Sequence, residues 1–337
     1  MKAVGYKVPG PIEGEESLVD ISLPEPSPTG RDLLVEVKAV SVNPVDYKVR
    51  RSAAPQDSKW KVLGWDAAGI VRTVGPDVTL FQPGDEVFYA GSITRPGTNA
   101  ELHLVDERIV GKKPASLDWA EAAALPLTTL TAWEAFFDRL DVNKPVSGAA
   151  RAILIIGGAG GVGSVAVQIA RQRTDLTVIA TASRPETQDW VKTLGAHHVL
   201  DHSKPLAAQV EALGIGAPAF VFSTTHTGDH VGEIVELIAP QGRLCLIDDP
   251  AGFDIMAFKR KAVSIHHELM FTRPIYGTPD MAEQGRILNE ASALVDAGNL
   301  RTTLTERLSP INAANLKHVH ALLESGKARG KIVLEGF

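Results

Sequence analysis

IIGGAGGVG, from Ile155 to Gly163, is the stretch of this sequence that decides its fold. It lies between an apolar run, typical of a strand, and a helical pattern from Ser164 to Gln172. Gly158, Gly160 and Gly163 fit the spacing G-x-G-x-x-G, in which the absence of Cβ atoms lets amides at a helix N-terminus approach a pyrophosphate. We therefore predict a dinucleotide-binding turn; a glycine turn without a ligand is the alternative.

Outward from this turn, the chain alternates apolar runs with helical segments. The apolar runs, typical of parallel strands covered on both faces, are 153–156, 178–181, 220–222 and 244–247. The helical segments between them are 164–172, 185–194 and 230–238. Gly195 and Gly242 stand where left-handed residues would end a helix. This alternation predicts a doubly wound parallel sheet, whose ligand crevice lies at the carboxyl ends of its strands.

The flanking regions follow a different pattern. Short apolar runs at 33–40, 69–75 and 85–90 indicate an irregular β domain in the first third of the chain. Alanine-rich sequence after Ser116 predicts a helix capped by that residue, and helical sequence continues to Leu140. An amphipathic helix at 313–325 precedes a strand at 331–334, which we expect to return to the first domain.

Composition narrows the functional classes. The 337 residues correspond to about two domains. A net charge of -6 without a Lys/Arg-rich run makes nucleic acids and anionic membrane surfaces unexpected partners. The uncharged stretch 152–170 contains five glycines and the N-terminal residues lack a signal-peptide pattern, so we expect no membrane span and a cytoplasmic location. The single cysteine, Cys245, excludes an intramolecular disulfide, a thiolate-rich zinc site and an iron–sulfur cluster.

Four residues at the end of the second apolar run indicate which cofactor is bound. Thr181-Ala182-Ser183-Arg184 offers a hydroxyl and a cation where a carboxylate would bind the ribose 2′-hydroxyl of NAD. Because a hydroxyl and a cation suit a 2′-phosphate, we predict NADPH. The alternative is that Ser183 and Arg184 only cap the following helix.

Several motifs occur together in the order of one protein family. They are Asn43-Pro44-Val45-Asp46, Gly64 to Val71, Gly84 to Val87, Leu130-Thr131-Ala132, the glycine turn and Leu194-Gly195-Ala196. Over essentially its whole length the chain resembles the medium-chain dehydrogenase/reductases, and within them the zinc-free quinone oxidoreductase branch with its zinc-type alcohol dehydrogenase-like subgroup. The resemblance implies an α/β protein with a GroES-like β-rich catalytic domain at 1–127 and 303–337, and a Rossmann NADPH-binding domain at 128–302. It also implies a homodimer through the edge of the Rossmann sheet, where the strand at 263–267 is the matching segment.

Two positions depart from the zinc-dependent members of this family. Those members have a cysteine where this chain has Asn43, and Gly-His-Glu where it has Gly64-Trp65-Asp66. Neither Asn nor Trp offers the thiolate or imidazole that holds Zn²⁺ tightly, so we predict no metal. His226 and His230 are four residues apart, but His226 falls in an expected loop, and we do not predict a metal site there either.

Without a metal, hydrogen bonds must polarise a carbonyl substrate. The resemblance directs Asn43 and Tyr47 toward the nicotinamide, and a tyrosine hydroxyl can donate a hydrogen bond or a proton at neutral pH. We predict hydride transfer from NADPH to a quinone or to the β-carbon of an α,β-unsaturated carbonyl, with the oxyanion held by Asn43 or Tyr47. In the alternatives, these two residues only stabilise their loop, or the protein is a zinc-dependent alcohol dehydrogenase, or it binds NADPH without catalysis.

The resemblance implies further cofactor contacts. They are Asn43 and Thr131 at the nicotinamide, Gly158, Ala159, Gly160, Gly161 and Val162 at the pyrophosphate, Ser183 and Arg184 at the 2′-phosphate, and Ser223, Ile247 and Phe271 along the crevice. Lys331 resembles a cationic cofactor contact, with a solvated lysine at a strand end as the alternative. The segments 55–61 and 271–279 are expected to select the substrate.

Overall fold

The structure is a computed structural model, and it describes residues 1–55 and 59–337. Its contacts divide the chain into two compact units. Unit 1 comprises Met1–Leu130 and Phe271–Phe337, and unit 2 comprises Thr131–Met270. The units differ from the predicted domains mainly at 271–302, because α9 (Glu283–Asp296) packs against β8 (Val110–Lys112) of unit 1.

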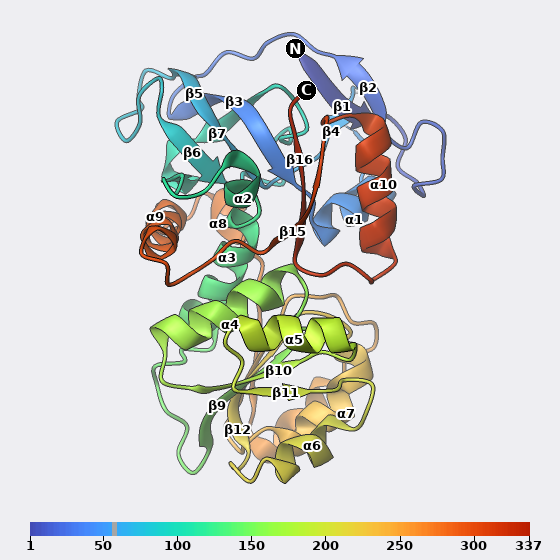
Figure 1. Ribbon diagram of the computed structural model, residues 1–337, viewed down its shortest axis with the longest axis vertical. Coiled ribbons are helices and arrows are strands. Elements are labelled where there is room, and N and C mark those ends of the chain that lie inside the picture. The colour runs from blue at the N-terminus through green and yellow to red at the C-terminus, as the bar shows by residue number, and fades with distance from the viewer. Residues whose placement is uncertain (56–58) are drawn as a thin grey trace. The chain divides into compact units, whose positions relative to one another are not determined.

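Unit 2 is built on a six-stranded parallel sheet with the order β11-β10-β9-β12-β13-β14. Its elements are η3 (Glu134–Arg139), β9 (Ala150–Ile156), α4 (Gly161–Arg173), β10 (Thr177–Thr181), α5 (Pro185–Thr193), β11 (His198–Leu200), α6 (Leu206–Ala212), β12 (Pro218–Ser223), α7 (Thr227–Leu237), β13 (Arg243–Leu246), η4 (Ile255–Lys261) and β14 (Ser264–His267). Within this unit, α4 and α5 lie together over the sheet in Figure 1. Side chains of α6, α7 and η4 form a buried apolar core with the sheet, which includes Leu154, Val221 and Phe258. The predicted doubly wound parallel sheet is confirmed.

Two glycines were expected to end helices in left-handed conformations, and one does. Gly195 has φ +109° and follows the C-cap residue of α5. The prediction for Gly242 is wrong, because Gln241 takes the positive φ, at 62°. Gly242 is needed for close packing instead, since a Cβ there would lie 2.8 Å from the carbonyl oxygen of Ala239.

Unit 1 contains two sheets. The smaller has the order β2-β1-β4, and the larger has the order β15-β16-β3-β5-β6-β8, with β7 paired to β3. The elements are β1 (Lys2–Tyr6), β2 (Val19–Ser22), β3 (Asp32–Ser41), α1 (Pro44–Ser52), β4 (Lys61–Val62), β5 (Ala67–Val74), β6 (Glu86–Tyr89), β7 (Leu102–Asp106), η2 (Glu107–Ile109), β8, α2 (Trp119–Ala123), α3 (Pro126–Trp133), α8 (Thr272–Tyr276), α9, β15 (Leu304–Leu308), α10 (Ala313–Glu324) and β16 (Lys331–Glu335). The α3 helix continues from unit 1 into unit 2. The irregular β domain expected from the sequence is therefore confirmed.

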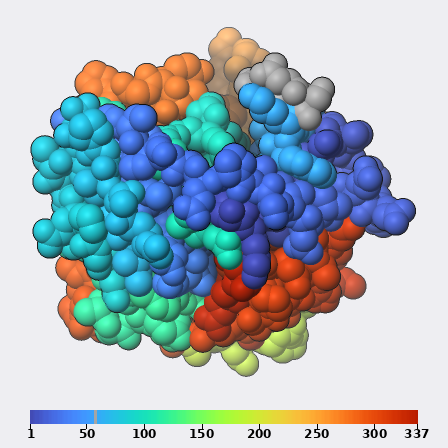
Figure 2. All heavy atoms as spheres, turned by 90° about the horizontal axis from the view of Figure 1, so that it is seen from above, coloured from blue at the N-terminus to red at the C-terminus, as the bar shows by residue number. Residues whose placement is uncertain are grey.

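The C-terminal segment completes unit 1. The strand β16 pairs antiparallel with β3, where Val333 lies opposite Ser41, so the predicted return to the first domain is confirmed. The α10 helix packs against α1, and Ala313 N donates a hydrogen bond to Asp20 Oδ1 of β2 at 2.8 Å. Figure 2 shows the blue N-terminal and red C-terminal atoms side by side on one face of this unit.

The helices differ from expectation at two points. Ser116 is not a helix cap, because α2 begins at Trp119 with Asp118 as its N-cap, and Asp118 accepts a hydrogen bond from Glu121 N at 2.8 Å. Ser116 Oγ instead donates to Asp296 Oδ1 at 2.6 Å. The helical sequence up to Leu140 is also not uniformly α-helical, since η3 is a π-helix. No helix within 1–55 or 59–337 combines the length and apolarity that a membrane span needs.

Candidate functional site

The glycine turn follows β9, and two close approaches require glycine in it. Gly157 has φ +80°, and a Cβ there would lie 2.4 Å from Thr224 Oγ1. A Cβ at Gly163 would lie 2.2 Å from the carbonyl oxygen of Gly157, far inside van der Waals contact. At Gly160 the nearest atom would be 3.5 Å away. The strictest steric requirements therefore fall on Gly157 and Gly163, and Gly157 lies outside the predicted G-x-G-x-x-G spacing.

The first turn of α4 presents backbone amides to a ligand. Gly160 is its N-cap residue, and no side chain caps the helix there. The first amides of a helix have no acceptor within it, and the positive end of the helix dipole favours an anion. Gly160, Gly161 and Val162 are half-buried, whereas Gly158 and Ala159 are buried beneath them in the turn. These residues fit the pyrophosphate of a dinucleotide.

Thr181, the last residue of β10, connects the glycine turn to a histidine. Thr181 Oγ1 accepts a hydrogen bond from Gly157 N at 3.0 Å and lies 3.1 Å from His202 Nδ1. Burial, and after it the nearby His230, lower the pKa of His202. His202 follows β11 in the sequence, and the neighbouring positions of β11, β10 and β9 bring it close to the turn. No motif identified His202, because its position depends on strand order.

Ser183 and Arg184 follow β10 as expected. Arg184 is the N-cap residue of α5, and its backbone N–H donates to Thr187 Oγ1 at 3.2 Å. The cap thus uses the Arg184 backbone, whereas its exposed guanidinium pairs with exposed Glu186, Nε to Oε1 at 3.2 Å. An ion pair between exposed side chains is worth little. Arg184 can therefore cap α5 and still offer its cation to an anionic ligand.

The predicted crevice residues of unit 2 lie at neighbouring strand ends. Ser223 ends β12, and Ile247 follows β13 and donates its backbone N–H to the carbonyl oxygen of Ser223 at 3.3 Å. The Ser223 hydroxyl is buried and bonded to Thr227 Oγ1 at 2.7 Å, so it also supports the start of α7. Thr131 is buried on α3. Ser223 and Ile247 thus lie at the carboxyl ends of neighbouring strands, next to the glycine turn, and their contact with a cofactor stays a prediction.

Unit 1 contains a buried cluster of charged and amide side chains. Lys331 is 3% exposed, which excludes the solvated lysine expected as the alternative. Its Nζ donates to the carbonyl oxygen of Val42 at 3.0 Å and to Asn43 Oδ1, and it lies 3.2 Å from Asp66 Oδ2. These three neighbours can accept all three ammonium protons. Asp66 Oδ1 accepts a further hydrogen bond from Leu127 N at 3.2 Å.

Asp46 is the second carboxyl group of this cluster. Its two oxygens accept backbone hydrogen bonds from Asn43 N at 2.7 Å and Gly64 N at 2.9 Å. Burial raises the pKa of Asp46 to about 7, against the opposing effects of those N–H donors and of Lys331. Burial also raises the pKa of Asp66 and lowers that of Lys331, while their mutual attraction opposes both changes. Asp46 and Asp66 both belong to motifs of the family resemblance, but no role was predicted for either residue.

The cluster distinguishes Asn43 from Tyr47. Asn43 is 2% exposed, and its Nδ2 donates to the carbonyl oxygen of Ser41 at 3.3 Å and to Asp66 Oδ2 at 3.1 Å. Both amide protons of Asn43 are therefore used inside unit 1. Tyr47 is half-buried on α1, and its hydroxyl has no hydrogen-bond partner in the described parts of the chain. Of the two predicted catalytic residues, only Tyr47 keeps a donor for a substrate.

The residues around Asn43 do not fit a zinc ion. An amide and an indole replace the thiolate and imidazole donors, and Asp66 is already paired with the Lys331 ammonium. No group of three or more His, Cys, Asp or Glu side chains suited to a metal occurs in the described ranges. His226 precedes α7 in a left-handed conformation, and Cys245 is buried on β13, where burial raises its thiol pKa.

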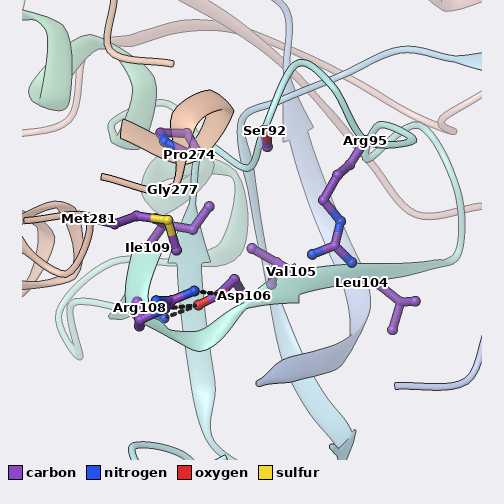
Figure 3. A pocket seen from close by; sticks show the side chains of 10 residues that line it. All are labelled: Ser92, Arg95, Leu104, Val105, Asp106, Arg108, Ile109, Pro274, Gly277 and Met281. Carbon is purple, nitrogen blue, oxygen red and sulfur yellow. Dashed lines mark hydrogen bonds and ion pairs between the residues drawn. The ribbon is translucent and has the colours of Figure 1, made fainter. Parts of the chain in front are cut away.

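A small cavity of about 150 Å³ lies elsewhere in unit 1, between β7, η2 and the α8 region (Figure 3). The segment 271–279, predicted to select the substrate, contributes Pro274 and Gly277 to its lining. Both arginines of the lining have carboxylate partners: Arg95 pairs with Asp32 at 2.7 Å, and Arg108 pairs with Asp106 at 2.8 Å. This cavity offers no uncompensated charge. The other segment predicted to select the substrate, 55–61, includes 56–58, which lie outside the described residues.

Comparisons with known proteins agree with this architecture. Residues 29–115 match the alcohol dehydrogenase GroES-like domain, and residues 194–334 match the zinc-binding dehydrogenase family. A zinc-type alcohol dehydrogenase-like protein of Staphylococcus aureus strain MSSA476 is 41% identical over 339 residues, covering 99% of each chain. The protein belongs to the medium-chain dehydrogenase/reductase superfamily. It is an oxidoreductase of this superfamily.

Solved structures of this superfamily have the same fold. A Rhizobium etli CFN 42 protein, whose name refers to zinc-dependent alcohol dehydrogenase, is 80% identical, with a TM-score of 0.99 and coverage of 100% of this chain and 98% of that one. The quinone oxidoreductase of Coxiella burnetii is 27% identical, with a TM-score of 0.81 and coverage of 100% and 99%. The superfamily thus includes relatives named for zinc and a relative named for quinone reduction.

Proposed function

We propose that this protein transfers a hydride from NADPH to a quinone or an α,β-unsaturated carbonyl without zinc. The buried cluster of Asn43, Asp66 and Lys331 is the observation that carries this proposal. In it, an ammonium group compensates the carboxyl groups that a divalent cation would otherwise neutralise. The cluster also fixes the start of α1, through the bonds between Asn43 and Asp46, and α1 carries Tyr47.

The preference for NADPH is supported by Arg184. Its guanidinium is exposed, and its partner Glu186 is a weak competitor for a 2′-phosphate with two negative charges. We expect R184A to raise the Kd for NADPH about tenfold and to leave that for NADH unchanged, because a charge-assisted hydrogen bond contributes roughly 1.5–3 kcal/mol. Isothermal titration with both nucleotides measures this. Equal losses for NADPH and NADH would contradict a contact between the Arg184 guanidinium and the 2′-phosphate.

In the proposed reaction, the glycine turn and Arg184 would hold NADPH, which would supply the hydride for the electrophilic carbon of the acceptor. Negative charge then develops on the carbonyl oxygen, and the Tyr47 hydroxyl donates a hydrogen bond to it and supplies the proton. Asn43 holds the loop through its bonds to Ser41, Asp66 and Lys331. One positioned donor stabilises such a transition state by roughly 3–4 kcal/mol, which suits an activated acceptor better than an unactivated carbonyl.

Metal analysis and an acceptor panel test this function. We expect purified protein to lack stoichiometric zinc, to keep its activity with chelator, and to oxidise NADPH with quinones, alkenals or enones. Stoichiometric zinc with activity lost on chelation would instead support a zinc-dependent alcohol dehydrogenase. Tight NADPH binding without turnover on any acceptor would support a non-catalytic NADPH-binding protein.

We further propose a homodimer, located in the cytoplasm, that forms through β14. This strand is at one edge of the parallel sheet and is only partly buried, and the apolar Leu269 that follows it is 52% exposed. An uncovered edge strand next to an apolar side chain is suited to pairing with a second copy. We expect L269D to shift the protein from dimer to monomer in sedimentation, whereas a monomeric wild-type protein would contradict the proposal.

A further inference from the structure

Trp65 contains a buried hydrogen-bond donor that no described residue satisfies. Its side chain is 1% exposed, and its indole Nε1 finds no acceptor among the described residues. Trp190 provides a contrast, because its Nε1 donates to Ser164 Oγ at 2.8 Å. Buried polar groups in folded proteins are nearly always paired, and an indole N–H is a donor only. The Trp65 N–H is therefore a donor with no partner among residues 1–55 and 59–337, and it is available to an acceptor that the described residues do not supply.

The backbone of Trp65 is held on both sides by the buried cluster. The preceding residue, Gly64, donates its N–H to Asp46 Oδ1 at 2.9 Å, and the following residue, Asp66, pairs with Lys331 and Asn43. Trp65 is therefore positioned by the same interactions that position the start of α1.

Two neighbours define the surroundings of the indole ring. Phe271 meets it edge-on, with ring centroids 6.2 Å apart and an interplanar angle of 75°. Gly91 faces its Cδ1 atom, which is bonded to Nε1, and a Cβ at Gly91 would lie 3.7 Å from Cδ1. This edge of the ring thus faces a residue without a side chain, in a left-handed conformation with φ +62°.

We propose that the Trp65 indole N–H donates a hydrogen bond to the carbonyl oxygen of the acceptor substrate. This inference rests on the proposed function and identifies a binding residue for its substrate class. A carbonyl oxygen needs only a donor, whereas an alcohol also needs an acceptor for its own proton, which an indole does not provide. Trp65 therefore favours the oxidised, carbonyl form of a substrate over the corresponding alcohol.

Indole resonances test the contact directly and without turnover. The chain has five tryptophans, so ¹⁵N-TROSY spectra of the protein saturated with NADP⁺ contain five indole N–H signals. W65F assigns the Trp65 signal, and single Phe variants of the other tryptophans assign it by elimination if W65F does not fold. We expect a bound quinone or enone to move the Trp65 proton downfield. An unmoved Trp65 signal at saturating acceptor, with binding visible in the acceptor's own lines, would overturn the proposal.

Kinetics and stability separate this role from a structural one. W65F removes the N–H but keeps a ring, so we expect KM for the acceptor to rise about tenfold, the Kd for NADPH to stay constant, and Tm not to fall. W190F is the matched control: it removes an N–H that is bonded within the protein, and should lower Tm without changing KM. A lower Tm with unchanged KM in W65F would show that the Trp65 N–H bonds to a group within the protein, and it would overturn the proposal.

These experiments distinguish failure of the inference about Trp65 from failure of the proposed function. If no quinone or enone is reduced, the proposed function fails, whereas a Trp65 shift on binding would still establish the donor. If acceptors are reduced normally by W65F and its signal is unmoved in the wild-type protein, the inference about Trp65 fails and the proposed function stands.

Discussion

The glycine turn of unit 2 and the buried cluster of unit 1 reach their geometry by opposite means. The turn acts through backbone atoms of consecutive residues, and its close approaches arise because side chains are absent at Gly157 and Gly163. The cluster acts through side chains from three distant segments, at Asn43, Asp66 and Lys331. A turn built from backbone atoms has a residue spacing that is visible in the sequence. A cluster of side chains from distant segments forms only when the sheet brings those segments together. The following predictions test this difference.

Loss of the buried ammonium should have the largest effect. K331M leaves the carboxyl group of Asp66 buried and without its partner, and breaking a buried ion pair in this way typically costs about 3–5 kcal/mol. Urea denaturation of K331M measures the loss. The double variant K331M/D66N removes both charges and should recover part of the stability; no recovery would show that Lys331 acts through packing rather than charge.

The pH dependence of stability tests the second carboxyl group of the cluster. Because burial raises the pKa of Asp46 from 3.8 to about 7, the folded state holds a proton that the unfolded state releases between these values. Its contribution is therefore complete below about pH 4 and declines as the pH rises to about 7, by roughly 4 kcal/mol at 1.36 kcal/mol per pKa unit. Urea midpoints at pH 5 and pH 8 should differ less in D46N than in wild type. An equal difference would show that Asp46 titrates near its ordinary value.

A substitution in the glycine turn should weaken NADPH binding because it displaces the backbone, and not because it removes a charge. G163A places a Cβ where only 2.2 Å separates it from the carbonyl oxygen of Gly157, so the turn must move. A displacement of about 1 Å at a binding site can cost roughly 100-fold, and we expect a loss of that size in NADPH affinity. G160A is the control for folding, because its Cβ has ordinary contact at 3.5 Å, and its Tm should remain close to wild type. Similar Tm values and similar NADPH affinities in both variants would contradict this account.

Tyr47 should show the smallest effect, and one confined to catalysis. Y47F removes a hydroxyl that bonds to no described residue, so we expect turnover to fall at least about tenfold while Tm stays constant. N43A should differ, because it breaks bonds to Ser41, Asp66 and Lys331 and therefore lowers Tm as well. Unchanged Y47F kinetics across several acceptors would remove Tyr47 from the mechanism.

Much of the fold could be predicted from local pattern. The strands β9, β10, β12 and β13 are apolar runs because both faces of a parallel sheet are covered, and that composition is visible without a structure. Details that depend on competing side chains could not be predicted. Ser116 looked like a helix cap, but Asp118 takes that role because Ser116 is bonded to Asp296, far along the chain.

The candidate site shows the same division. The sequence predicted the amide positions of the glycine turn and the cation of Arg184 as cofactor contacts, because these residues lie within or just beyond single βα units. It also identified Asn43 and Lys331, but through family resemblance rather than through any local signal that would link them. His202 and the unpaired indole N–H of Trp65 were not found, because strand order places the first and only the surrounding packing shows that the second lacks a partner.

By itself, the sequence determined the parallel sheet, the glycine turn between β9 and α4 and the exclusion of a thiolate-rich metal site, since each depends on residue types and their short spacing. The tertiary structure alone decided that Lys331 is buried against Asp66, that Asn43 has both amide protons occupied, and that the Tyr47 hydroxyl bonds to none of the described residues. The physical reason is that a hydrogen bond or an ion pair is decided by distance and burial. Those quantities are set only when β3, β5 and β16 come together in one sheet.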